Sequence, residues 1–259
     1  PMEGVLPLAQ SFDTVGWMTR SSDLLKKVAK ILIPEDFRTQ VDIPEHVIWS
    51  SELIDSTHLN VATSLHAWIR RLNAFTRGNS DVWLEEKPLD EILGPYAGGE
   101  PSDRLSEWLS TYKIIQGYEA WKNHGAWIEQ HWSTLGSDVA SRFRDASELT
   151  EKEYRKAIDR MLFWKENLRS RLGDAVLLVP SSSSVAPRIS DSKIGGAAID
   201  AERTATMRLT CISGLAGLPA VNIPLRTAEG LPCGICVVGP AGSDLPLIDC
   251  ARKLAIAAE

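Results

Sequence analysis

Four consecutive serines, Ser181 to Ser184, have the residue type and position that could most readily do chemistry in this chain of 259 residues. They follow an apolar run, Ala175–Val179, that is stopped by Pro180. Such a run is typical of a strand buried on both faces, and α/β folds place ligand sites at the carboxyl ends of their strands. A nucleophilic serine is conceivable there, but no Gly-x-Ser-x-Gly turn surrounds it and no base can be assigned. A loop or capping role is the simpler interpretation, with substrate contact as the alternative.

A Cys-x-x-Cys pair, Cys233 and Cys236, has the spacing of redox and zinc motifs. The pair falls inside a predicted strand, where residues three apart point to opposite faces, so the two sulfurs are poorly placed to share one metal ion. We interpret both as small buried side chains and expect no metal site. The chain has no phosphate-cradling glycine loop, and we expect no cofactor.

Histidine and tryptophan gather in one helical stretch. His124 and His131 are seven residues apart, on one helical face if the helix continues through Gly125, but no HExxH spacing accompanies them. His124 stands between Trp121 and Trp127, which favours a polar group that faces an aromatic pocket over a metal ligand.

Hydrophobic spacing predicts the elements that position these residues. Helices are expected over Ser22–Leu32 with Ser22 or Asp23 as N-cap, over Leu59–Ile69, in succession from Pro101 to Gly173, over Glu202–Ile212, and after a Ser243-Asp244 cap. Strands are expected at Val47–Ile54, Asp81–Leu84, Ala175–Val179, Ala220–Pro224 and Gly234–Val238, the last two as antiparallel neighbours. The stretch from Ser181 to Ile199 is expected to be a loop. The fold class is therefore α/β, with a mixed β-sheet covered by helices.

Composition excludes several classes of function. The hydrophobic content of 44% and the charged content of 24% are ordinary for a globular protein, which excludes disorder. No apolar run is long enough to span a bilayer. The net charge of −6, with scattered Lys and Arg, argues against nucleic acid and anionic membranes as partners. The acidic cluster that contains Lys87 is interpreted as solvated surface; its carboxylates are Glu85, Glu86, Asp90 and Glu91.

The composition changes near Leu172. All 18 aromatic residues lie at or before Trp164, whereas all four cysteines and half of the 18 glycines lie after Leu172. We therefore expect residues 1–172 to form a helix-rich, aromatic cover and residues 173–259 to form the sheet core of the same unit. Four cysteines in a chain with an adequate core indicate reduced thiols and a cytoplasmic location.

Three motifs, in this order, resemble the second half of amidase-signature enzymes. They are Gly4-Val5-Leu6-Pro7-Leu8-Ala9-Gln10-Ser11-Phe12-Asp13-Thr14-Val15-Gly16-Trp17, then Gly217-Leu218-Pro219-Ala220-Val221-Asn222-Ile223-Pro224, then Leu231-Pro232-Cys233-Gly234-Ile235-Cys236-Val237-Val238-Gly239-Pro240-Ala241-Gly242-Ser243-Asp244. Gln10–Trp17, together with Asn123-His124-Gly125-Ala126-Trp127, looks most similar to indole-3-acetamide amidases.

The resemblance implies a mixed-sheet fold and hydrolysis of a carboxamide through an acyl-enzyme. The family uses a serine nucleophile, a second serine in a cis peptide bond and a neutral lysine, all in a Gly-Gly-Ser-Ser-containing region that precedes the first motif. No Gly-Gly-Ser-Ser occurs in this chain, so we assign no catalytic residue in it and expect the fold to be incomplete. The first motif, with Met at position 2 and no leader pattern, likewise looks like the middle of a longer sequence.

The resemblance also suggests substrate contacts, which we assign to Ser181, Ser182, Thr210, Cys211, His124 and Trp121. The chain departs from the family at Leu209 and Gly214, where many members have Phe and Asn, so substrate preference stays open. By analogy, Pro180–Pro187 lines the mouth of the pocket.

Three hypotheses follow. The chain could be the C-terminal half of an amidase for a small aryl or indole acetamide, and inactive alone. It could instead be a non-catalytic docking module, or one half of a split enzyme whose partner supplies the missing half. A sheet edge left open by a missing half would favour association, including homo-oligomers.

Overall fold

The computed structural model describes residues 4–35, 44–78, 82–94, 104–189 and 196–258. Its elements in chain order are α1 (Ser22–Leu32), β1 (His46–Trp49), α2 (Ser51–Asp55), α3 (Leu59–Gly78), β2 (Trp83–Glu86), α4 (Leu89–Leu93), α5 (Arg104–His131), the 3-10 turn η3 (Trp132–Thr134), α6 (Ser137–Ser147), α7 (Glu151–Leu172), β3 (Val176–Pro180), α8 (Ala197–Ala216), β4 (Ala220–Arg226), β5 (Pro232–Val238) and α9 (Asp244–Ala257).

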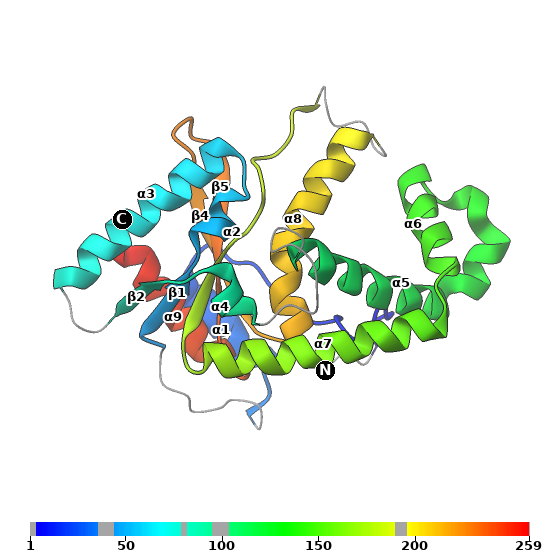
Figure 1. Cartoon of the computed structure of the whole chain (residues 1–259), viewed down its shortest axis with the longest axis horizontal. Coiled ribbons are helices and arrows are strands. Elements are labelled where there is room, and N and C mark those ends of the chain that lie inside the picture. Colours follow the sequence, from blue (N-terminus) through cyan, green and yellow to red (C-terminus); the bar gives the residue numbers. More distant parts are fainter. Residues whose placement is uncertain (1–3, 36–43, 79–81, 95–103, 190–195, 259) are drawn as a thin grey trace.

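The strands form one mixed sheet in the order β2-β1-β3-β5-β4 (Figure 1). β1 runs parallel to β2 and to β3, whereas β5 runs antiparallel to β3 and to β4. The predicted mixed sheet and the predicted antiparallel pairing of the last two strands are therefore confirmed.

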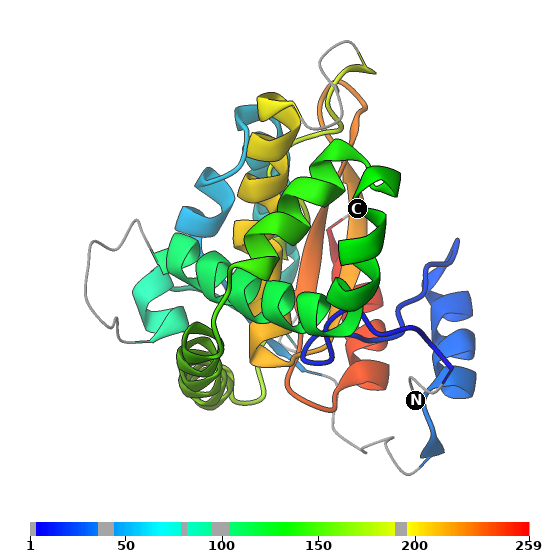
Figure 2. The same ribbon diagram turned by 90° about the vertical axis from the view of Figure 1, so that its right-hand side faces the viewer.

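Each face of the sheet has its own core, because side chains alternate along a strand. Leu177 and Val179 of β3 belong to a core with α5, α7 and α8, whereas Val176 and Leu178 belong to a second core with α3 and α9. All five residues of β3 are buried, as the continuous apolar run predicts. Figure 1 shows the sheet between these two layers of helices, and Figure 2 shows α5 and α6 standing in front of β4 and β5.

The long helix α7 begins and ends at recognisable signals. Thr150 and Glu153 form a capping box at its start, in which each side chain bonds the other residue's backbone N–H. Gly173, with a φ of 58°, ends the helix and donates its N–H to the carbonyl of Arg169. The predicted end at Gly173 is confirmed.

Two predicted strands have wrong bounds. Val47–Ile54 is a strand only to Trp49, and α2 begins at Ser51. Leu53 and Ile54 are buried from a helix, and the polar residues 50–52 separate them from the apolar residues of β1. The second strand is β2, two residues later than predicted at its start and end, and Asp81 of the predicted range lies outside the described residues.

The predicted bounds of α1 and the predicted position of the α9 cap are confirmed, whereas the start of α8 and two capping details differ. The N-cap of α1 is Ser21, whose hydroxyl accepts the Leu24 N–H, rather than Ser22 or Asp23. α8 begins at Ala197, so the predicted loop is too long. Gly196 is its N-cap in an extended conformation, and the negative charge of Asp200 in the first turn stabilises the start of the helix. Ser243 is the N-cap of α9, as predicted, but its hydroxyl donates to the Pro240 carbonyl and accepts no N–H of the helix. The predicted succession of helices is confirmed from Arg104 onward, and residues 101–103 lie outside the described ranges.

The large apolar residues of α1 are mostly exposed. Leu24, Ile31 and Leu32 lie open, with Ile31 81% exposed. Ala29 is buried, and ion pairs from Lys26 to Asp249 (2.6 Å) and from Arg252 to Asp23 (2.8 Å) tie this helix to α9. None of the helices that the structure describes has both the length and the apolar character needed to cross a bilayer.

Candidate functional site

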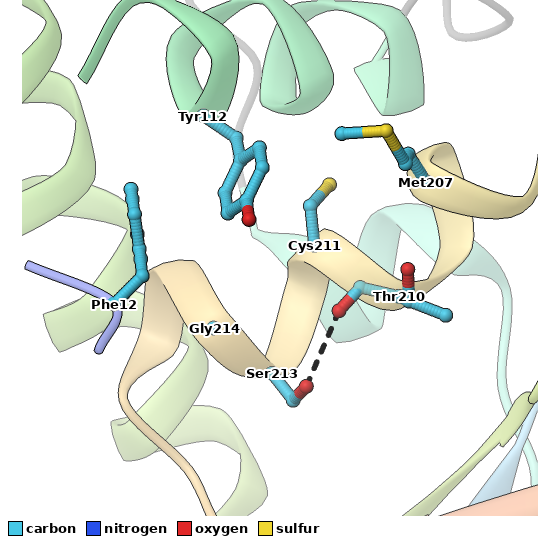
Figure 3. A pocket seen from close by; sticks show the side chains of 7 residues that line it. All are labelled: Phe12, Tyr112, Met207, Thr210, Cys211, Ser213 and Gly214. Carbon is cyan, nitrogen blue, oxygen red and sulfur yellow. Dashed lines mark hydrogen bonds between the residues drawn. The ribbon is translucent and has the colours of Figure 1, made fainter. Parts of the chain in front are cut away.

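A cavity of about 170 Å³ lies between α5, α8 and the segment that precedes α1 (Figure 3). Tyr112 of α5 and Phe12 of the N-terminal segment form its aromatic side. Its remaining lining comes from α8 and consists of Met207, Thr210, Cys211, Ser213 and Gly214. Thus two of the predicted substrate-contacting residues, Thr210 and Cys211, share one cavity.

The spacing along α8 explains why one helix supplies most of the lining. Met207, Cys211 and Gly214 are separated by four and three residues, so they lie on one helical face. At Gly214 a side-chain Cβ would stand 3.9 Å from the Phe12 ring and 4.0 Å from the Tyr112 ring, which are ordinary contact distances. The missing side chain at Gly214 therefore leaves space beside the two rings.

Phe12 reaches the cavity from a tight turn. The Asp13 carboxylate accepts the N–H groups of Leu8 (2.9 Å) and Ala9 (3.1 Å), and the N–H groups of Phe12 and Asp13 both donate to the Ala9 carbonyl at 2.9 Å. The Phe12 ring then packs on the Tyr112 ring with centroids 4.5 Å apart. The first sequence motif thus builds one wall of the cavity.

The cavity lining is uncharged at neutral pH. Burial raises the pKa of the Cys211 thiol to about 12, and burial together with the neighbouring Cys211 raises the pKa of Tyr112. The hydroxyls of Thr210 and Ser213 donate to carbonyls of their own helix, at 3.2 Å and 3.3 Å. A thiol held in this protonated state is a poor nucleophile. The lining is therefore suited to bind an apolar group and not to supply a nucleophile.

Ser181 and Ser182 lie at the end of β3 and are not among the residues that line the cavity. The Ser181 hydroxyl donates to the side-chain carbonyl of Asn222 on β4 and lies 3.6 Å from the Cys236 sulfur. Gly234 leaves room for this contact, because a Cβ there would stand 2.7 Å from the Asn222 oxygen. The Ser182 hydroxyl donates to the Ser184 carbonyl at 2.8 Å. This local hydrogen bond agrees with the simpler interpretation of the serines as loop residues.

The neighbouring Ser183 is fully buried and anchors the serine loop to α8. Its hydroxyl lies 2.9 Å from the Thr206 hydroxyl, and its carbonyl accepts the His58 N–H at 2.7 Å. The His58 ring pairs with Glu202 of α8 at 3.1 Å. The sequence analysis did not assign these partners, since they come from three separate segments of the chain.

His124 and Trp121 lie outside the lining of the cavity. His124 Nε2 is 2.7 Å from the Pro7 carbonyl oxygen, so this histidine holds the N-terminal segment. Trp121 stacks on Trp132 with ring centroids 6.0 Å apart. Trp127 is 55% exposed and stacks on His131 at 4.3 Å.

Of the other candidates, the Cys-x-x-Cys pair is half-buried rather than buried as predicted, and the acidic cluster lies at the surface. Cys233 packs against the core beneath α3 and α9, and Cys236 packs against the opposite core, so the pair does point to two faces. The described part of the chain has no group of three or more His, Cys, Asp or Glu side chains arranged to hold a metal ion. In the acidic cluster, Glu85 pairs with His46 (2.8 Å) and Lys87 (3.3 Å) at the surface.

Comparisons with known proteins identify the relatives of this chain. It is 25% identical over 269 residues to Amidase 1 of Arabidopsis thaliana, covering 95% of this chain and 61% of that protein. It is 23% identical over 265 residues to the chloroplastic outer envelope protein 64 of Arabidopsis thaliana, covering 97% of this chain and 44% of that protein. No protein-family model matches the chain.

A solved amidase structure has the same fold. It superposes with a TM-score of 0.74 at 25% identity, covering all of this chain and 54% of the amidase. The predicted resemblance to amidase-signature enzymes and the predicted fold are therefore confirmed, and the chain is an amidase relative. It spans between about two fifths and three fifths of the length of the relatives described above.

Proposed function

We propose that the protein to which this chain belongs hydrolyses a small amide that carries an aryl or apolar group. Water is added across the C–N bond, which yields a carboxylic acid and ammonia. The chain supplies the sheet, its helical cover and the wall of the acyl-group pocket, and the attacking serine, the second serine and the lysine base are supplied by an N-terminal half. The relationship to amidases supports the reaction class.

The observation that carries the substrate class is the uncharged lining of the cavity. Phe12, Tyr112 and Met207 offer apolar surface, and the Cys211 thiol is held neutral by burial. An engineered apolar cavity of about 150 Å³ binds benzene, so 170 Å³ suits one aromatic ring better than an indole. The hydroxyls of Ser181 and Ser182 are proposed to meet the substrate from the end of β3, and Thr210 from α8. His124 and Trp121 are proposed to act indirectly, through the N-terminal segment.

We propose a cytoplasmic location on the state of the thiols. All four cysteines are free, and burial raises the pKa of each. Free thiols, of which Cys211 and Cys250 are buried and the other two half-buried, suit a reducing compartment, where they stay protonated and unpaired.

The test is hydrolysis of phenylacetamide, indole-3-acetamide and acetamide by the whole protein, with ammonia release as the readout. We expect kcat/KM for phenylacetamide to exceed that for acetamide by about tenfold or more, because the ring leaves water for an apolar cavity. A Gly214→Leu variant, which fills the cavity, should remove this preference. Equal turnover of all three amides, or none by a folded whole protein, would refute the proposal.

A further inference from the structure

Glu119 of α5 is a buried carboxylate beside the pocket that the proposed chemistry does not use. It is 7% exposed, and three donors converge on it. The Ser11 N–H donates at 2.9 Å, the Ser11 hydroxyl at 2.6 Å and the Tyr154 hydroxyl at 2.9 Å. Each partner is a donor, so an ionised carboxylate, which offers only acceptors, matches all three.

This carboxylate ties the N-terminal segment to the helix that also forms the pocket. Further along the same helix, Asn123 exchanges hydrogen bonds with the Gln10 side chain (2.9 and 3.1 Å) and donates to the Leu8 carbonyl (3.0 Å). Tyr112 and Glu119 are seven residues apart, so they lie on one face of α5. Figure 2 shows the segment crossing this helix. The tie and the aromatic wall are thus built on the same helical face.

Ser11 is the residue before Phe12, so fixing its backbone fixes where the Phe12 ring lies. The ring packs on Tyr112 and faces the open position at Gly214 (Figure 3). Cys211 lines the same cavity and is only 4% exposed. If the turn moved away from α5, the cavity would lose one wall and the Cys211 sulfur would meet solvent.

We propose that Glu119 is a positioning residue that holds Phe12 against the pocket and thereby sets the size of the group that the pocket accepts. The consequence for amide selectivity rests on the proposed function, whereas the holding of Phe12 does not. A carboxylate is required because a glutamine would turn an N–H₂ group toward one of the three donors. Glu119→Gln therefore loosens the turn while leaving the volume of the side chain almost unchanged.

The holding of Phe12 is tested by alkylation of the intact chain with iodoacetamide, with peptide mass spectrometry resolving the four cysteines. Cys211 reports on the pocket, and Cys250, in the opposite core, reports on global unfolding. Both are buried thiols whose pKa burial raises to about 12, so both should react slowly in the native chain.

We expect Glu119→Gln to accelerate alkylation of Cys211 by about tenfold and to leave Cys250 unchanged, as for a local opening. Phe12→Ala should accelerate Cys211 similarly, and combining the two changes should add little. The matched control is Glu129→Gln, an exposed carboxylate of the same helix, which should change neither rate. An unchanged Cys211 rate in Glu119→Gln would overturn the proposal.

Global unfolding of Glu119→Gln would accelerate both cysteines equally. In that event Tyr154→Phe and Ser11→Ala, which each remove one hydroxyl donor, decide the matter: selective acceleration of Cys211 supports the proposal, and equal acceleration of both cysteines overturns it. The selectivity is read separately, as the dissociation constant for acetamide divided by that for phenylacetamide, and this ratio should fall toward one in Glu119→Gln. Failure of the native protein to bind either amide would refute the proposed function, while the alkylation rates would still judge the positioning role.

Discussion

The indole rings of Trp108 and Trp164 stack with centroids 4.9 Å apart and planes 10° from parallel. Trp108 lies on α5 and Trp164 on α7, and both are buried in the core that covers one face of the sheet. The pair fixes α5, the helix that carries Tyr112 and Glu119, against its neighbour. The geometry of the pocket thus depends on packing away from the pocket.

Trp164→Ala should lower the free energy of unfolding by about 3–5 kcal/mol, because it removes a large buried ring and leaves a cavity. Urea denaturation followed by circular dichroism measures the change. Trp127→Ala is the control. This ring is exposed and stacks only on His131 among the ring contacts of the described residues, so its removal should lower the free energy of unfolding by no more than about 0.5 kcal/mol. Equal losses for the two variants would contradict the assigned packing.

Gly214 offers substitutions that separate pocket volume from stability. Gly214→Ala should stabilise the chain by about 0.5–1 kcal/mol, because alanine favours the helix and its methyl group meets only ordinary contacts. Gly214→Leu should fill the space beside Phe12 and Tyr112 and weaken binding of phenylacetamide by at least about tenfold. Calorimetric binding and thermal unfolding together test this, and unaltered binding by the leucine variant would place the ligand elsewhere.

The capping box of α7 predicts a pH dependence. Hydrogen bonds from the Thr150 hydroxyl and backbone lower the pKa of the Glu153 carboxyl below its usual 4.5. A carboxyl with a lowered folded-state pKa stabilises the fold above its unfolded-state pKa, and this contribution is lost as the pH falls through the lower, folded-state value.

Glu153→Gln should therefore flatten the fall in stability below about pH 4.5, and the urea midpoint measured at steps between about pH 6 and pH 3 reports it. Glu151→Gln provides a comparison in the same helical turn, because Glu151 pairs with Arg155 but takes no part in the capping box. An identical pH profile for Glu153→Gln and the native chain would refute the role of the box.

The outer edge of β4 predicts association of the isolated chain. Ala220 of β4 lies opposite Val238 of β5, and the Gly239 N–H donates to the Pro219 carbonyl at 2.9 Å. Ala220 and Val238 are therefore a pair of opposed residues that do not hydrogen-bond to each other. Ala220 and Asn222 therefore direct their backbone N–H and C=O groups away from β5, at the last strand of the described sheet. Such an edge can pair with another chain.

Sedimentation velocity should show the mean mass of the isolated chain rising with concentration, and Ala220→Lys should reduce the rise because edge charges oppose pairing. Ala126→Lys, on an exposed face of α5, should not. A monodisperse monomer with cooperative unfolding would argue against both the open edge and the half-domain interpretation.

The sequence predicted those parts of the fold whose signals are local. Ala175–Val179 was recognisable as a strand because every residue in it is apolar, and Gly173 was recognisable as a helix end. The range Val47–Ile54 was predicted as one strand, but Leu53 and Ile54 are buried from α2, and two apolar residues alone do not distinguish a strand from a buried helix. The early start of α8 was missed since few of its first residues pack in a core.

The pocket was predicted only in part, because its walls meet through tertiary contacts. Thr210 and Cys211 were selected through the family resemblance, whereas Phe12 and Tyr112, a hundred positions apart, could not be paired from spacing. The motif that contains Phe12 indicated a segment of functional interest, although it did not specify which of its residues lines the pocket. Glu119 was not singled out in the sequence analysis, because its three hydrogen-bond donors come from residues distant along the chain.

The central claim is that this chain holds the acyl-group pocket and lacks the groups that attack the amide. It is tested by measuring ammonia release from phenylacetamide with the purified 259-residue chain, and again after adding a separately expressed N-terminal half that carries the two serines and the lysine. We predict no release above buffer from the chain alone and enzymatic release from the mixture. Turnover by the chain alone would contradict the account.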